Sequence, residues 1–473
     1  MSEKIDRRSF LATTGVGLSM LGALGGTASA EAPDTAQAAA NAAHSDNLLQ
    51  SNLARRMMNT PGPNELFRAD PLKKVRVGFI GVGGQGSSHV RNFTGIPNVE
   101  IKAVCDLVES KVVRNQEVVT HAGMSKPEGY FKGDHDFLNL VARDDIDLVY
   151  IVTPWEWHVP MMLAALKAGK HAVTEVPAAI TLEECWQLVE AQEQSKRHAC
   201  MMENCCYGRF ELMVLNLVRQ GLLGELIHAE GGYLHDLRQV KFGTVGEGEW
   251  RRAHATRRNG NLYPTHGLGP LAQCLNINRG DQFDFMVSMS SKTRGLELYA
   301  KSHLEAGDAR RNERYVLGDV NSSLIRTRNG CTLVVMHSCD CPRPYSRITN
   351  LQGTKGIVNG YPDRVYIQGR SPNDTFQKAE ELYPEFDHPL WKSRGANATS
   401  AGHGGMDYIE DFRLVECLLK GEPTDQNVYD AASWSAVSAL SEWSVAHNSR
   451  PIDFPDFTRG QWKKWQPLGI IET

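Results

Sequence analysis

The chain has 473 residues and a formal net charge of −4 at pH 7, so neither sign of charge dominates. No basic stripe stands out, which gives no reason to expect a nucleic-acid partner, and a chain of this length predicts two domains with extensions. The 10 cysteines are scattered without zinc-type spacing, so we expect buried or partly buried thiols and no bound metal.

Residues 1–30 read as an export signal. Arg7 and Arg8 precede an apolar, glycine-rich run that ends at the small-x-small sequence of Ala28, Ser29 and Ala30. This pattern predicts a twin-arginine signal and a periplasmic protein, with an uncleaved N-terminal anchor as the alternative. The run is too short and too rich in Gly and Thr to remain as a stable membrane span. A twin-arginine route carries folded proteins, so any nucleotide cofactor would be bound before export and then retained.

Residues 31–72 are rich in Ala, Asn, Ser and Pro, which indicates an exposed arm or linker with a short helix near residues 47–58. From residue 73 to residue 205 the pattern alternates apolar strands with helical stretches, as in a parallel sheet. Its expected later strands and helices are 146–153, 158–168, 171–176, 182–195 and 199–203. We predict a doubly wound, dinucleotide-binding Rossmann domain.

The first strand of this domain runs into a glycine-rich turn. Gly81, Gly83 and Gly86 have G-x-G-x-x-G spacing, with Gly84 and Gln85 inside the turn. Such a turn lets the backbone approach a pyrophosphate and lets the following helix aim its N-terminal amides at the phosphates. The next apolar run, 99–104, leads to Asp106, whose carboxylate suits the ribose hydroxyls of NAD and disfavours the extra phosphate of NADP.

Residues 206–473 have a different pattern, in which strand-like segments dominate, and this pattern predicts a substrate-binding α+β domain. A helix at 210–219 is followed by strand-like segments at 227–233, 284–291, 320–327, 332–337, 346–353, 356–358 and 365–367. One helix interrupts them at 267–275, and two amphipathic helices at 407–419 and 428–447 are expected to return to the first domain. The fold class is therefore α/β overall, with an open, mostly antiparallel second sheet whose free face could form a homo-oligomer.

The chain resembles the glucose-fructose oxidoreductase and inositol dehydrogenase family. The resemblance rests on the glycine turn, on Thr153, Pro154 and His158, and on the triplet that begins at Glu175, which reads Glu-Val-Pro where that family usually carries Glu-Lys-Pro. It implies a substrate that lies over the nicotinamide between two domains. Val176 stands where the family lysine handles a hydroxyl proton, and an aliphatic side chain cannot do that work.

A finer resemblance is to glycoside hydrolase family 109, the NAD-dependent α-N-acetylgalactosaminidases. It rests on runs 155–158, 175–177, 202–207, 263–267 and 403–407 and on the export signal. It implies hydrolysis of a glycan or small glycoside with a terminal α-N-acetylgalactosaminyl residue, with retention. In that reaction NAD oxidises C3 transiently, the aglycone is eliminated, water adds and the hydride returns. The alternatives are a periplasmic sugar oxidoreductase with tightly bound NAD(P) and a non-catalytic sugar-binding module.

Tyr263 and His266 lie three residues apart just before a predicted helix, so they can face one cavity. We assign His266 to the C3 hydroxyl proton and leave the C2 proton to Tyr263 or Tyr207. A helix-capping or core histidine is the alternative for His266.

The resemblance further implies two sets of binding residues. Those expected near the nicotinamide and its ribose are Trp155, Trp157, His158, Glu175, Val176 and Asn204, although both tryptophans could equally be core residues. Those expected near the sugar are Tyr233, Arg252, Tyr263, Pro264, Thr265, His266 and Tyr345.

Overall fold

The computed structural model describes residues 51–244, 246–398, 401–469 and 471. The predicted export signal and residues 31–50 of the predicted arm therefore lie outside the described residues. The short helix expected in the arm is α2 (Asn52–Met58), and the Ser51 side chain caps it by accepting a hydrogen bond from the Ala54 amide. Among the helices of the described part of the chain, none is both long and apolar enough to cross a membrane.

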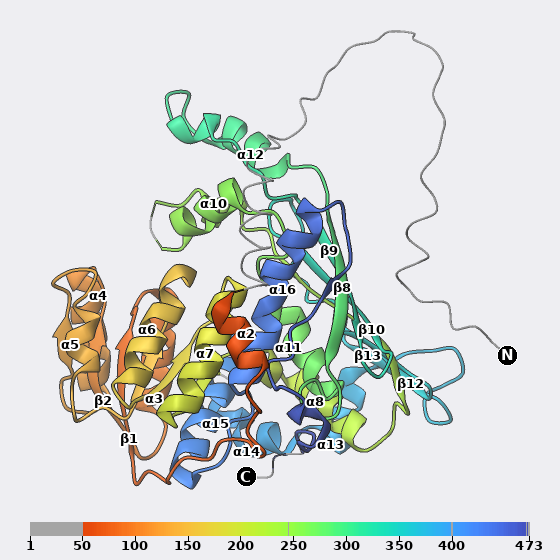
Figure 1. The fold of residues 1–473 in the computed structure, drawn as a ribbon, viewed down its shortest axis with the longest axis horizontal. Coiled ribbons are helices and arrows are strands. Elements are labelled where there is room, and N and C mark those ends of the chain that lie inside the picture. Colours follow the sequence, from red (N-terminus) through yellow and green to blue (C-terminus); the bar gives the residue numbers. More distant parts are fainter. Residues whose placement is uncertain (1–50, 245, 399–400, 470, 472–473) are drawn as a thin grey trace. The chain divides into compact units, whose positions relative to one another are not determined.

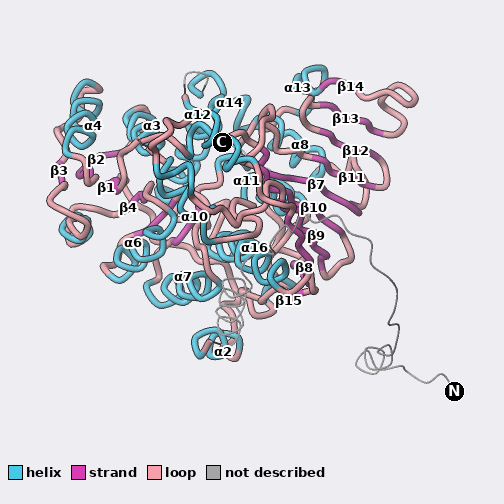
Figure 2. Tube along the Cα trace, turned by 90° about the horizontal axis from the view of Figure 1, so that it is seen from above, coloured by secondary structure: helices cyan, strands magenta, loops and turns pink. Residues whose placement is uncertain are grey.

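The first sheet, of which Figure 1 labels β1 and β2, has six parallel strands in the order β3-β2-β1-β4-β5-β6. The strands are β1 (Val75–Ile80), β2 (Val99–Cys105), β3 (Glu128–Tyr130), β4 (Leu148–Ile151), β5 (His171–Thr174) and β6 (Ala199–Met201). The connecting helices are α3 (Gly84–Thr94), α4 (Glu109–His121), α5 (Phe137–Val141), α6 (Trp155–Lys167) and α7 (Leu182–Ser195). Figure 2 shows α3 and α4 on one side of the strands and α6 and α7 on the other. Every residue of β4 and β5 is buried, as covering on both faces requires.

The second sheet has nine strands in the order β14-β13-β12-β11-β7-β10-β9-β8-β15. They are β7 (Leu226–Leu234), β8 (Phe283–Ser290), β9 (Asn321–Thr327), β10 (Thr332–Ser338), β11 (Asn350–Gly353), β12 (Gly356–Asn359), β13 (Arg364–Ile367), β14 (Gln377–Lys378) and β15 (Ile452–Asp453). Only β7 and β10 pair in parallel; the other pairs are antiparallel. The predicted fold class, an α/β chain with an open, mostly antiparallel second sheet, is confirmed.

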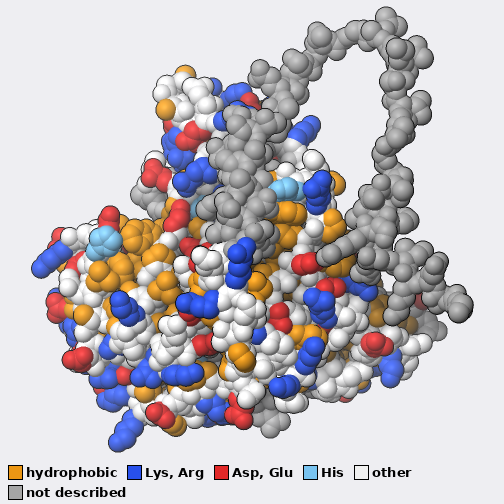
Figure 3. Space-filling view, in the orientation of Figure 1, with side chains coloured by type: hydrophobic (Ala, Val, Ile, Leu, Met, Phe, Trp, Pro, Cys, Tyr) orange, Lys and Arg blue, Asp and Glu red, His pale blue; other side chains and the backbone are white. Residues whose placement is uncertain are grey.

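Helices cover one face of this second sheet. α11 (Thr265–Cys274) packs on β7, and α16 (Val428–Ala446) packs on β8, with α8 (Arg209–Arg219) beside α11 (Figure 2). On the other face, alternate residues of β9 are exposed, among them Leu324. On the side of the whole molecule that Figure 3 shows, lysine, arginine and acidic side chains are interspersed. The homo-oligomer through the open sheet stays a prediction.

Several helices were not predicted from the sequence. They are α9 (Arg238–Lys241), α10 (Gly248–Arg257), α12 (Gly295–His303), α13 (Tyr383–Phe386) and α14 (Pro389–Ala398). α15 (Met406–Lys420) was predicted, and it packs against α3 and against the short 3-10 turn η2 (Asn204–Tyr207) that follows β6. The C-terminal helices therefore contact the cofactor domain.

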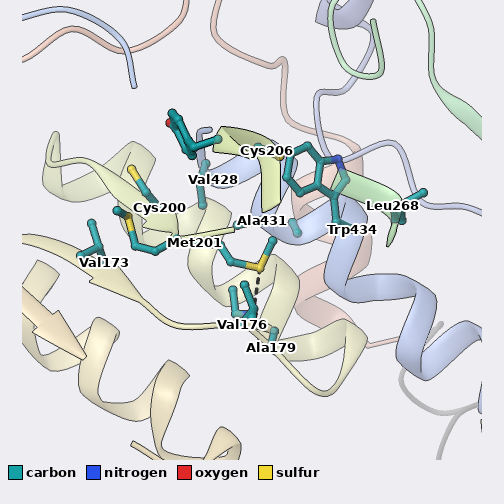
Figure 4. Close-up of a cluster of buried hydrophobic side chains, with 14 of the residues drawn as sticks. Val173, Val176, Ala179, Cys200, Met201, Cys206, Leu268, Val428, Ala431 and Trp434 are labelled. Carbon is teal, nitrogen blue, oxygen red and sulfur yellow. Dashed lines mark hydrogen bonds between the residues drawn. The ribbon is translucent and has the colours of Figure 1, made fainter. Parts of the chain in front are cut away.

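An apolar cluster joins the first sheet to α16. Figure 4 shows Val176 and Met201 in one group with Val428, Ala431 and Trp434 of α16. Val176 is only 2% exposed. Because its side chain belongs to this core, position 176 contributes packing, and proton transfer must come from elsewhere.

Candidate active site

The turn between β1 and α3 uses its three fingerprint glycines for different physical reasons. Gly81 has φ +86°, and a Cβ there would lie 2.3 Å from the Val152 carbonyl oxygen. A Cβ at Gly86 would lie 1.9 Å from the Gly81 carbonyl oxygen, so this glycine permits close packing of α3 on the turn. A Cβ at Gly83 or Gly84 would meet nothing within 4 Å. The turn therefore has open space beside the backbone amides that begin α3, which fits a dinucleotide pyrophosphate.

Asp106 lies at the end of β2 beside this turn. Its Oδ2 accepts a hydrogen bond from the Val82 amide at 3.1 Å, and its Oδ1 accepts one from the Val108 amide at 3.0 Å. The carboxylate thus ties β2 to the glycine turn, at the edge of the sheet where the ribose of a bound dinucleotide lies in this fold. The predicted ribose contact stays a prediction.

A cluster of aromatic side chains lies at the end of the second sheet. Tyr233 of β7, Tyr263 before α11 and His266 in the first turn of α11 have ring centroids 4.5 to 5.2 Å apart. Trp155, the first residue of α6, lies 5.7 Å from Tyr263. Trp155 comes from the cofactor domain and the other three from the second domain, so the cluster joins both. A small cavity adjoins it, lined by side chains that include Arg251, His254 and His337.

Two glycine pairs explain why His266 lies so close to β7. A Cβ at Gly231 would lie 2.3 Å from the Gly267 carbonyl oxygen, and a Cβ at Gly267 would lie 2.0 Å from the Gly232 amide nitrogen. Only glycine allows the backbones of β7 and α11 to approach this closely. The approach places the start of α11, and with it His266, against Tyr233.

Glu203 orients His266. This carboxylate is fully buried directly after β6, and its Oε1 lies 2.7 Å from His266 Nδ1. Burial opposes ionisation, but the charge and the hydrogen bond of His266 outweigh it and lower the pKa of Glu203. An ionised Glu203 accepts a hydrogen bond from the Nδ1–H group of His266, which leaves Nε2 as the ring nitrogen that can accept a proton.

The arginine beside the cluster is Arg251 rather than Arg252, and the sugar contact predicted for Arg252 stays a prediction. The Arg251 guanidinium carbon lies 4.7 to 5.3 Å from the ring centroids of Trp250, Trp155 and Tyr263. Arg252 points elsewhere: its Nε donates to Glu313 Oε2 at 2.9 Å and its Nη1 donates to a backbone carbonyl. Adjacent residues of α10 face different directions, so the two arginines cannot share one role.

Tyr207 does not join the cluster, which corrects its assignment as a catalytic candidate. Its hydroxyl donates to Asp425 Oδ2 at 3.1 Å, and the residue lines a different buried cavity together with Glu410 and Arg413. Burial, with the nearby Asp425 carboxylate, raises the pKa of Tyr207 well above its usual value. The phenol is held as a hydrogen-bond donor within the core.

The structure separates the predicted cofactor contacts. Trp157 is half-buried and packs beside His135 and Phe137 rather than with Trp155, and its predicted contact with the cofactor stays a prediction. His158 is buried, with its ring nitrogens 2.8 Å from the carbonyl oxygens of Thr153 and Pro177, so it supports the strand ends.

The other residues that were predicted to bind the cofactor or the sugar differ in their contacts and their exposure. Glu175 Oε1 lies 2.8 Å from His89 Nε2, and Asn204 donates to Asp407 Oδ1 at 2.7 Å. Tyr345 is 37% exposed, with its ring 6.2 Å from Tyr233, so it borders the outer side of the cluster. Pro264 and Thr265 are buried and begin α11, so their side chains do not face solvent.

Within the described residues, one group of side chains is close enough together to hold a metal ion: Glu203, Cys205 and His266, with ligand atoms within 4.8 Å of one another. Burial raises the pKa of Cys205 well above its usual value, so its thiol stays protonated, and metals bind the thiolate. Glu203 and His266 are already paired with each other. The expectation of a metal-free site stays a prediction.

Sequence reasoning missed Glu203, Arg251 and His89 as site residues. Glu203 had a signal that could have been used, because it follows a buried parallel strand just as Asp106 and Glu175 do. Arg251 had none, since nothing in the sequence distinguishes it from Arg252, the arginine beside it.

The glycine turn, the parallel sheet and the aromatic cluster against it define an NAD-binding enzyme of the oxidoreductase fold with a second domain that completes the active site. A family model described as the oxidoreductase family, NAD-binding Rossmann fold, matches residues 75–203. A second model, glycosyl hydrolase 109, C-terminal domain, matches residues 207–464.

Curated relatives agree with the second model. A glycosyl hydrolase family 109 protein of Solibacter usitatus is 50% identical, over 84% of this chain and 91% of its own length. One of Shewanella pealeana is 48% identical, over 87% of this chain and 92% of its own length. The chain belongs to glycoside hydrolase family 109, and it is an NAD-dependent glycoside hydrolase.

Solved structures share the fold at low sequence identity. Levoglucosan dehydrogenase in complex with NADH and levoglucosan superposes with a TM-score of 0.62 at 18% identity, over 81% of this chain and 100% of its own. An oxidoreductase domain protein of Kribbella flavida superposes with a TM-score of 0.63 at 18% identity, with the same coverage.

Proposed function

We propose that the protein hydrolyses terminal α-N-acetylgalactosaminyl residues with retention of configuration, through transient oxidation of the sugar at C3. The observation that carries this proposal is the Glu203–His266 pair, which faces two tyrosines while Val176 is buried in the core. NAD, when bound, would supply hydride transfer from C3 and back to C3 within one turnover.

His266 is the base that this chain offers for the C3 hydroxyl. With Nδ1 bonded to Glu203, Nε2 is free to accept a proton as the hydroxyl carbon is oxidised. The buried carboxylate then stabilises the imidazolium that forms and fixes the orientation of the ring. This role does not need the lysine that the related dehydrogenases usually carry at position 176.

Tyr263 is the better of the two tyrosines for the C2 proton. Burial raises the pKa of Tyr263 well above its usual value, but the nearby Arg251 guanidinium opposes that rise. Tyr207 instead donates its hydroxyl hydrogen to a carboxylate. Tyr263 therefore shares the cluster with His266, whereas the Tyr207 hydroxyl is bonded to Asp425, and oxidation of the sugar at C3 makes the C2 proton more acidic.

The same geometry disfavours an ordinary two-carboxylate mechanism. A retaining enzyme of that type needs a carboxylate that can attack the anomeric carbon. Glu203 is 0% exposed behind His266, so it cannot touch a bound sugar.

We propose further that the protein acts in the periplasm, as the twin-arginine sequence at Arg7 and Arg8 predicts.

The test is to remove the nucleotide and measure cleavage of an aryl α-N-acetylgalactosaminide. We expect the stripped protein to be inactive, added NAD+ to restore cleavage, and no net NADH to accumulate. Undiminished cleavage by stripped protein would contradict the proposal. Net formation of an oxidised sugar would instead support the sugar oxidoreductase alternative.

A further inference from the structure

The segment 402–407 joins the second domain to the cofactor turn, and the proposed chemistry gives it no role. It consists of a tight corner, η5 (Gly402–Gly405), followed by the first turn of α15. His403, Gly404 and Gly405 all have positive φ values, of 50°, 71° and 102°. His403 is the residue among these three that has a Cβ, so the left-handed conformation is costly there and neighbouring contacts must hold the corner.

Asp407 supplies those contacts. It is 0% exposed, and its Oδ2 accepts a hydrogen bond from Gln85 Nε2 at 3.1 Å and lies 2.8 Å from His403 Nδ1. Its Oδ1 accepts a hydrogen bond from Asn204 Nδ2 at 2.7 Å. One carboxylate therefore ties the corner to the glycine turn and to the end of the first sheet, across 322 residues of sequence in the case of Gln85.

The next turn of α15 repeats the attachment. Asp411, four residues further on the same face, lies 2.8 Å from His89 Nδ1 and accepts a hydrogen bond from Asn92 Nδ2 at 2.9 Å. His89 and Asn92 are residues of α3. Both acidic residues thus hold α15 along the helix whose N-terminus faces the phosphate space.

The corner itself lies against the first turn of α3. A Cβ at Gly402 would lie 3.0 Å from Ser88 Oγ and 2.8 Å from Asp407 Oδ2. Ser88 follows the glycine turn by two residues, so the corner packs beside the end of α3 at which a dinucleotide pyrophosphate binds.

We propose that residues 402–407 form a clasp over the dinucleotide turn, with Asp407 as its positioning residue, and that this clasp sets the rate at which the bound dinucleotide dissociates. Asp407 acts through Gln85 and through the shape of the corner, so it need not touch the nucleotide. The hydrogen bond that His403 donates to the Asp407 carboxylate raises the pKa of His403, which favours an ion pair within the clasp. The inference needs only NAD binding, and it stands or falls separately from the glycosidase chemistry.

The experiment measures nucleotide release from the purified holoprotein. Protein loaded with NAD+ is desalted into buffer that contains an NAD-degrading enzyme, and the nucleotide still bound is quantified by chromatography over time. Asp407→Asn places an amide donor against the donors of Gln85 and Asn204, so we expect release about tenfold faster than from the wild type. His403→Ala, at a side chain that is 55% exposed, should give a smaller increase with little risk to folding.

Glu416→Gln is the matched control, because Glu416 lies on α15 but pairs with Arg413 and Lys420 of the same helix. It should release nucleotide at the wild-type rate. In a protein that already carries Gln85→Ala, Asp407→Asn should increase the rate of nucleotide release by a much smaller factor than it does in the wild type, since the two side chains act together.

The proposal would be overturned if a folded Asp407→Asn protein released its nucleotide at the wild-type rate. It would also be overturned if Asp407→Asn increased the release rate by the same factor with and without Gln85→Ala. If Asp407→Asn does not fold, His403→Ala is the deciding variant, and a wild-type rate of nucleotide release from that variant would overturn the proposal.

Discussion

Replacing His266 with alanine should lower kcat/KM for an aryl α-N-acetylgalactosaminide by about a thousandfold while the protein keeps its NAD. The reason is that His266 is the cluster's side chain that can accept a proton near neutral pH, and its orientation is set by a buried partner. Without the imidazole, the C3 hydroxyl has no base at hydrogen-bond distance. Steady-state kinetics with nucleotide content measured on the same sample would check this.

Two variants control for indirect effects. Glu203→Gln keeps the shape of the partner but removes its charge, so it should lower kcat/KM by a smaller factor, about ten- to a hundredfold. His228→Ala removes a half-buried imidazole that contacts Thr332 of the second sheet, and should leave activity unchanged. Retention of more than a tenth of the activity in His266→Ala would remove this residue from the chemistry.

Alanine substitutions in the glycine turn should separate nucleotide binding from folding. Gly86→Ala would force a Cβ to within 1.9 Å of the Gly81 carbonyl oxygen, so we expect it to lower the free energy of unfolding by about 3 kcal/mol. Gly83→Ala meets no protein atom within 4 Å, so the protein should fold normally. Its methyl group would occupy space beside the pyrophosphate, and NAD affinity should fall about a hundredfold.

Gly95→Ala is the control at the other end of α3. A Cβ there would meet the Asn92 carbonyl oxygen at 3.5 Å, an ordinary contact, and the φ of −97° suits alanine. We expect near-wild-type stability and retained NAD. Thermal unfolding and isothermal titration with NAD+ would measure both quantities. Equal effects of Gly83→Ala and Gly95→Ala on NAD affinity would show that the fingerprint position has no special role.

Local patterns in the sequence were sufficient for most of the fold. α7 has its predicted bounds, because Thr181 and Glu184 form a capping box at its start and its apolar residues recur at helical spacing. The strand expected over residues 146–153 is β4 (Leu148–Ile151), because the apolar run extends past the last paired residue. Periodicity identifies an element more reliably than it identifies the element's ends.

The site was harder to predict because its partners are far apart in the sequence. Glu203 and His266 are separated by 63 residues, and nothing near either one indicates the other. The segment that became α10 has a weak helical pattern, and its arginines read as a solvated face. Two of the rings around Arg251, those of Trp155 and Tyr263, come from other parts of the chain, and only the tertiary structure shows which arginine lies beside them.

The most direct test of the account is to run the hydrolysis in deuterated water and locate deuterium in the released sugar by NMR. If oxidation at C3 acidifies the neighbouring position, the proton at C2 is removed and later replaced from solvent. The account therefore predicts deuterium at C2 of the released N-acetylgalactosamine. Released sugar with its original hydrogen at C2 would contradict it.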